Sequence, residues 1–97
     1  MICRNPFKES AGYNKWLAVL ESNHKGWWLP GGGVDWGETF EVGGKRECIE
    51  EAGMQVQLKG VLNVDYYTTL REGHKTMLRM IYYAEPVSLE AADNPKS

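Results

Sequence analysis

Residues Gly32–Met54 read GGVDWGETFEVGGKRECIEEAGM, and both ends of a helix can be recognised within this stretch. Thr39 is a favourable N-cap, because its hydroxyl can accept a hydrogen bond from a backbone N–H of the first turn. Gly53 suits the other end, since glycine readily adopts the left-handed conformation that commonly follows a helix. We therefore predict a helix over Phe40–Ala52, entered from a loop of three glycines, Gly31 to Gly33.

Three glutamates fall on one face of this predicted helix. Glu47, Glu50 and Glu51 are spaced i, i+3 and i+4, which places their carboxylates within about one turn of each other. A divalent cation such as Mg²⁺ would relieve their repulsion, because Mg²⁺ prefers oxygen ligands. The alternative is an acidic face turned to solvent. Arg46 can hold a carboxylate in place, and Cys48 is expected to face the core.

A wider pattern favours the metal site over the solvated face. Its fixed positions are Gly32, Glu38, Arg46, Glu47, Glu50, Glu51 and Gly53, with apolar residues at Cys48 and Met54. At a usage of roughly 7% per residue type, seven fixed identities match one window by chance about once in 10⁸. The pattern resembles the Nudix box, Gly-x5-Glu-x7-Arg-Glu-U-x-Glu-Glu-x-Gly-U, in which U is hydrophobic. With lower specificity, the resemblance extends from Lys15 to Pro86.

The resemblance implies an activity and a cofactor. It identifies the chain as a pyrophosphohydrolase that cleaves the diphosphate linkage of a small nucleoside diphosphate derivative. Mg²⁺ would be the cofactor, with Mn²⁺ as a substitute, and clustered Mg²⁺ suits phosphoryl substitution because it stabilises negative charge and positions water. The alternatives are a catalytically weak, nucleotide-binding or regulatory Nudix domain and a fragment that depends on a partner.

The resemblance also implies roles for individual residues. Glu50 and Glu51 would be the principal metal ligands, and the carbonyl of Gly31 would be a further ligand. Glu47 would bind the metal or its water, or act as the general base. Arg46 is assigned to the catalytic group as an orienting residue. The substrate would lie against Gly32, Gly33 and the supporting Glu38, because glycines let the backbone approach a diphosphate closely.

The remaining elements predict an α+β fold. The apolar run Trp16–Leu20 predicts a strand buried on both faces, and Trp27–Leu29 predicts a short extended segment. After the helix, Gln55–Leu70 and Met77–Ala84 predict an antiparallel pair joined by a turn over residues 71–74. The resemblance implies a Nudix-type α/β/α sandwich around a mixed β-sheet, here without the C-terminal helix.

The expected domain organisation is a single domain over residues 1–97, incomplete at the C-terminus and shortened at the N-terminus. No amphipathic helical pattern follows Pro86, so one face of the sheet should expose apolar side chains. Unpaired strand edges give such a chain a route to association. We therefore expect a homodimer, a domain-swapped assembly or a marginally folded chain.

Composition excludes several classes of partner. The 11 basic and 13 acidic residues give a formal net charge of −2 and form no run of one sign, which argues against a long nucleic acid as partner. No apolar stretch is long enough to span a membrane or direct export. The two cysteines are too few for a disulfide framework, which favours the cytoplasm.

Aromatic and histidine residues are the remaining candidates for substrate contact. Trp28, Trp36, Tyr66 and Tyr67 could stack on a base, although packing is the more ordinary role of such residues. His24 and His74 lie in predicted turns and are given no role.

Overall fold

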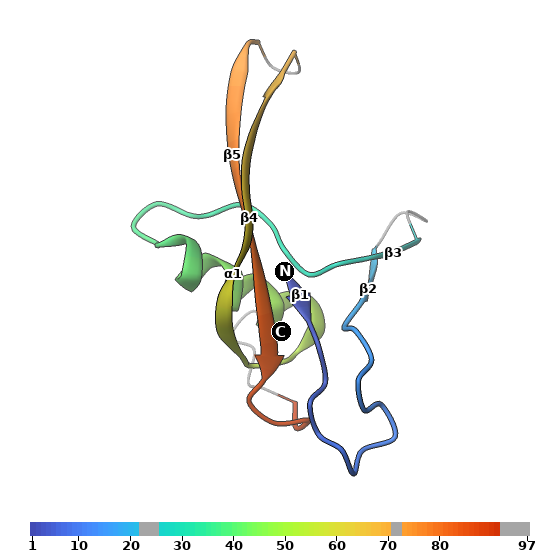
Figure 1. Ribbon diagram of the computed structural model, residues 1–97. Helices are drawn as coiled ribbons and strands as arrows, with labels where there is room; N and C mark the ends of the chain where they lie inside the picture. The colour runs from blue at the N-terminus through green and yellow to red at the C-terminus, as the bar shows by residue number, and fades with distance from the viewer. Residues whose placement is uncertain (22–25, 71–72, 92–97) are drawn as a thin grey trace.

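The computed structural model describes residues 1–21, 26–70 and 73–91 (Figure 1). In chain order the elements are β1 (Ile2–Cys3), β2 (Val19–Glu21), β3 (Gly26–Trp28), α1 (Phe40–Ala52), β4 (Val56–Thr69) and β5 (Lys75–Pro86). This confirms the predicted α+β class. Residues 87–91, the last described part of the chain, contain no helix. None of the described segments forms a helix with the length and apolar character needed to cross a membrane.

Helix α1 has the bounds that its capping residues predicted. Thr39 Oγ1 accepts a hydrogen bond of 3.2 Å from the backbone N–H of Val42 and so satisfies one donor of the first turn. At the other end Gly53 has φ 65°, and its N–H donates to the carbonyl of Ile49. A left-handed residue at this position ends the helix and turns the chain toward β4.

The main sheet is mixed and has the order β1-β5-β4. Strand β1 runs parallel to β5, with Ile2 opposite Tyr83. Strands β4 and β5 are antiparallel along their whole length, as predicted, from the pair Val56–Pro86 to the pair Thr69–Lys75. Part of the turn predicted between them, residues 71 and 72, lies outside the described residues.

The prediction of a buried strand over Trp16–Leu20 is wrong in its bounds and in its burial. The strand there is β2, which begins only at Val19. Val19 is buried, whereas Trp16 is 58% exposed and Leu20 is 67% exposed. The cause is topological, because β2 pairs with β3 in a separate two-stranded sheet and not with the strands that α1 covers.

The core lies where α1 packs on the inner end of the main sheet. Its buried members are Cys3, Cys48, Val56 and Ala84, with Met1, Leu17, Ala52, Met54 and Leu58 packed against them. Cys48 therefore faces inward, as predicted. Burial raises the pKa of the Cys48 thiol to about 12 and that of the Cys3 thiol to about 11. Both cysteines are free and remain protonated at neutral pH.

Beyond α1, strands β4 and β5 continue as a long hairpin that projects from the body of the molecule (Figure 1). We call its outer part, residues 61–70 and 73–80, the arm. Near the body, burial alternates along β5, and Tyr82, Ala84 and Pro86 are buried on the face that carries the core. Every residue of Lys75–Arg79 is exposed. The arm therefore shows the uncovered apolar surface that the sequence led us to expect.

Gly53 and Gly60 form a matched pair for testing the helix end. A Cβ at either position would meet no atom within 4 Å, but only Gly53 has a positive φ. We expect Gly53→Ala to lower the free energy of unfolding by about 1–2 kcal/mol, the cost of the left-handed conformation for an L-residue. Gly60→Ala should lower it by less than ~0.5 kcal/mol. Urea denaturation measures both changes, and equal losses would contradict the argument from backbone conformation.

Candidate active site

Two hydrogen bonds join the backbone of the glycine loop, between β3 and α1, to side chains of the helix. The N–H of Gly31 donates to Glu51 Oε1 at 2.9 Å. The carbonyl of Gly33 accepts a hydrogen bond of 2.9 Å from Arg46 Nη2. Glu51 and Arg46 lie more than one turn apart on α1, so the loop is held to the helix at two separate points.

Arg46 is the centre of the site. Its Nε donates to Glu38 Oε2 at 2.7 Å, and its Nη1 donates to Glu47 Oε1 at 2.8 Å and to Glu50 Oε2 at 3.1 Å. Asp35 Oδ2 lies 3.5 Å from Nη2. The planar guanidinium carries five N–H donors in a fixed geometry, which lets one side chain serve partners from the loop and from the helix.

Glu38 connects the guanidinium with the backbone of the loop. Besides its two bonds to Arg46, Glu38 Oε1 accepts a hydrogen bond of 2.8 Å from the N–H of Asp35. A Cβ at Gly43 would lie 3.3 Å from Glu38 Oε1 and 3.4 Å from Val34 Cγ2. The close approach of Glu38 and Val34 leaves little room for a side chain. It therefore explains why glycine stands here in spite of its unfavourable helix propensity.

Gly32 is in closer contact still. A Cβ at this position would come within 2.6 to 2.8 Å of the carboxylate atoms of Glu47. Gly32 does not have a positive φ, so its need for glycine is one of space. Because the Glu47 carboxylate is the far end of a flexible side chain, a larger residue at position 32 would displace Glu47 at small cost to the fold.

The charge at this site is predominantly negative. One guanidinium faces Glu38, Glu47 and Glu50 in hydrogen-bonded pairs and Asp35 at a longer distance, while Glu51 bonds to the loop. These hydrogen bonds, first the one to Glu38 and then the one to Glu47, raise the pKa of Arg46 above its usual value. Arg46 is thus a permanent cation, and the acidic side chains outnumber it.

The oxygen atoms of these carboxylates and of the loop carbonyls are the type of ligand that a divalent hard cation prefers. In the described parts of the chain, however, no three acidic, His or Cys side chains converge as a group that could hold a metal ion. The Arg46 guanidinium instead donates hydrogen bonds to one oxygen of Glu47 and one oxygen of Glu50.

The structure brings together the residues that the sequence singled out, from Gly31, Gly32, Gly33 and Glu38 in the loop to Arg46, Glu47, Glu50 and Glu51 on α1. Sequence reasoning missed Asp35, which adds a further acid near Arg46. Its position two residues after the last glycine was the available signal. Cys48 is fully buried in the core, where no substrate reaches its sulfur, which argues against a role as nucleophile.

The aromatic candidates for base stacking lie on the surface. Trp28, Trp36 and Tyr66 are largely exposed, and Tyr67 is 49% exposed and 5.8 Å from the Arg79 guanidinium carbon. Trp28 precedes the glycine loop along the chain and Trp36 follows it, whereas Tyr66 and Tyr67 lie on the arm. His74 is exposed, and His24 lies outside the described residues.

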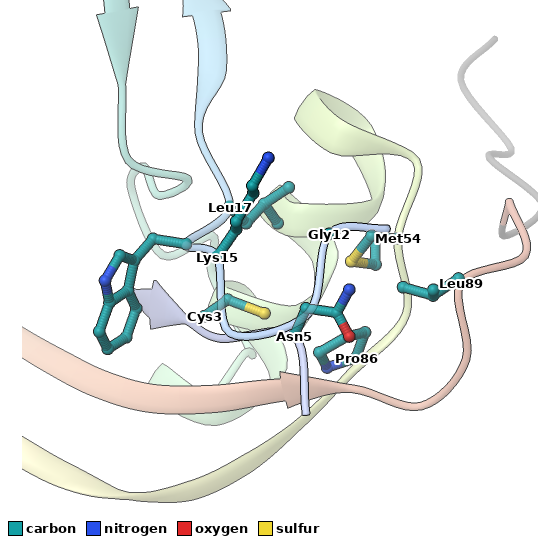
Figure 2. A pocket seen from close by; sticks show the side chains of 9 residues that line it. Cys3, Asn5, Gly12, Lys15, Leu17, Met54, Pro86 and Leu89 are labelled. Atoms are coloured by element: carbon teal, nitrogen blue, oxygen red, sulfur yellow. The ribbon is translucent and has the colours of Figure 1, made fainter. Parts of the chain in front are cut away.

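A small cavity of about 170 Å³ lies elsewhere, beyond the C-terminal end of α1 (Figure 2). Its walls are mainly apolar and include Cys3, Leu17, Met54 and Pro86. No glutamate and no glycine of the loop–helix site lines it. We therefore treat it as separate from the candidate active site.

The family model described as NUDIX domain matches residues 10–97, and the chain belongs to the Nudix family. Searches of curated proteins and of solved structures returned no match. Nudix enzymes hydrolyse small nucleoside diphosphate derivatives and generally use divalent metals.

Arg46 and Arg79 offer a comparison between a shared and an isolated ion pair. Arg46 is 21% exposed and holds several acidic groups, whereas Arg79 is 57% exposed and pairs with Asp65. We expect Arg46→Met to lower the free energy of unfolding clearly more than Arg79→Met, because it leaves clustered carboxylates without their cation. Arg79→Met removes only an exposed pair, which contributes little to stability. Urea denaturation near neutral pH measures both, and comparable costs would contradict a central role for Arg46.

Proposed function

We propose that this chain hydrolyses the diphosphate linkage of a nucleoside-diphosphate-linked small molecule in a magnesium-dependent reaction. The observation that supports this most directly is the Arg46 network, which holds the glycine loop against the helix face that carries Glu47, Glu50 and Glu51. Membership of the Nudix family supports the same class of reaction.

In this proposal Glu50, Glu51 and the backbone carbonyl of Gly31 hold the cation, and Glu47 assists as a further ligand. The hydrogen bond between Gly31 N–H and Glu51 supports the choice of these residues, because it brings the loop backbone and a carboxylate together. When bound, Mg²⁺ or its substitute Mn²⁺ would neutralise charge on the diphosphate and supply an activated water.

The other residues of the site position the reacting groups. Gly32 and Gly33 let the substrate diphosphate lie against the loop backbone, where a side chain would keep it away. Arg46 and Glu38 fix the loop relative to α1 through their paired hydrogen bonds. Glu47 is proposed either to bind the metal or its water or to accept the water proton, and Gly32 supports both roles by leaving room for its carboxylate. The leaving phosphate takes the electron pair of the broken P–O bond.

We place this activity in the cytoplasm. The supporting observation is chemical, since both cysteines are free thiols in the core and a reducing compartment keeps such thiols reduced.

Replacement of one proposed ligand tests the reaction. We expect Glu50→Gln to lower kcat about 10²–10³-fold, because a bound metal contributes several kcal/mol to transition-state stabilisation. The control is Glu41→Gln, which removes an exposed carboxylate from the first turn of the same helix and should change kcat less than about twofold. Release of nucleoside monophosphate from a panel of nucleoside diphosphate derivatives gives the rates.

Full turnover by Glu50→Gln would contradict the proposed catalytic group. A different result would favour a nucleotide-binding or regulatory role, namely saturable binding of a nucleotide by the unaltered chain with no product over several hours. Calorimetry on the same substrate panel distinguishes these two outcomes.

Metal binding should also stabilise the fold. At tenfold excess over its dissociation constant, a ligand of the native state adds about 1.4 kcal/mol, which raises the thermal midpoint of a small domain by roughly 5–10 °C. We expect this rise with MgCl₂ and with MnCl₂ but not with NaCl of equal ionic strength. The double variant Glu50→Gln/Glu51→Gln should lose the rise. Differential scanning calorimetry makes the measurement, and an unchanged midpoint at millimolar Mg²⁺ would mean that the site does not bind the metal.

A further inference from the structure

The two faces of the β4–β5 hairpin have opposite chemical character. Residues directly opposite each other in an antiparallel pair share a face, and faces alternate along the strand. A register shift between Val61 and Asn63, at Leu62, places Val61 and Val64 on the same face. That face carries the pairs Val61–Tyr82, Val64–Met80, Tyr66–Leu78 and Thr68–Thr76, and the other carries Asn63–Ile81, Asp65–Arg79 and Tyr67–Met77. The first face bears no charge, whereas the second contains the ion pair of Asp65 with Arg79.

The uncharged face is the outward continuation of the core. Tyr82 on this face is buried, and so are Ala84 and Pro86 farther along the strand toward the body. Past Tyr82 the same face loses its cover, and Tyr66 is 75% exposed while its partner Leu78 is 55% exposed. The hairpin thus carries a core-like surface into solvent, away from α1 (Figure 1).

We propose that the uncharged face of the arm is a dimerisation surface that packs against the same face of a second copy of this chain. A like face is the fitting occupant, because two copies can meet on a two-fold axis without burying any charge. The Asp65–Arg79 pair remains in solvent on the outside of both arms. A nucleic acid or a charged peptide finds no complementary charge on this face.

The size of the face agrees with a reversible dimer. Tyr66 exposes 75% of an aromatic side chain, a type that buries about 150–250 Å². With the other exposed apolar side chains and the two threonines, the face offers on the order of 500 Å² per copy, close to half of a small specific interface. Two copies would bury about 1,000 Å², close to the lower bound for a specific interface. Interfaces at this lower end of size are typically weak and transient, so we expect a dissociation constant on the order of 1–100 μM.

Neighbouring residues of β5 provide a matched test. Leu78 lies on the uncharged face and Met77 on the charged face, and they are similarly exposed, at 55% and 44%. Sedimentation equilibrium of the full chain from about 1 to 300 μM should give a monomer–dimer equilibrium. We expect Leu78→Glu to raise the dissociation constant at least tenfold and Met77→Glu to change it less than twofold. Tyr66→Lys and Tyr67→Lys repeat the comparison on β4.

Circular dichroism of each variant checks that the fold is retained, which exposed positions should allow. The proposal is overturned by a chain that stays monomeric at 300 μM or by a dimer that responds equally to substitutions on both faces. A dimer weakened only by substitutions on the uncharged face supports it. Sedimentation does not depend on catalysis, so this result stands apart from the outcome of the hydrolysis assay.

Discussion

The geometry of the candidate site depends on the placement of a single guanidinium. Arg46 reaches Glu38 and the carbonyl of Gly33 on one side and Glu47 and Glu50 on the other. All of α1 is described, and only Gly43 and Cys48 in it are buried, so apolar packing alone gives the helix a small contact with the sheet. The helix is therefore held in two ways. Cys48 packs its inner side into the core, and the ionic hydrogen bonds of Arg46 hold the loop against its outer side.

Local signals were sufficient to predict α1 and the β4–β5 pair. Thr39 and Gly53 define the ends of the helix through hydrogen-bonding capacity and backbone freedom, both of which belong to single residues. The strand at Val19 shows the limit of such reasoning. Whether Trp16 and Leu20 are buried depends on which strands meet and on what covers them, and β2 joins a separate pair. Hydrophobic pattern does not carry that information.

The candidate site divides in a similar way. The spacing of Glu47, Glu50 and Glu51 along a helix predicts their common side, because helical periodicity is fixed. The contact of Asp35 with Arg46 was not predicted, since it depends on the path of the loop over α1. The preference for glycine at position 43 was not predicted either, because it comes from the approach of Glu38 and Val34 and not from the helix itself. The sequence indicated which residues form the candidate site, and the structure showed how the loop brings them into contact.

Glycine is favoured at positions 32 and 53 by two different properties. At position 53 the relevant property is backbone freedom, because Gly53 lies in the left-handed region. Asparagine tolerates that region, so position 53 could drift between these two residues over evolutionary time at modest cost. At position 32 the relevant property is the lack of a side chain, because the Glu47 carboxylate occupies the space that a Cβ would enter. A substitution at position 32 would therefore change the position of the Glu47 carboxylate first, while the stability of the protein hardly changed.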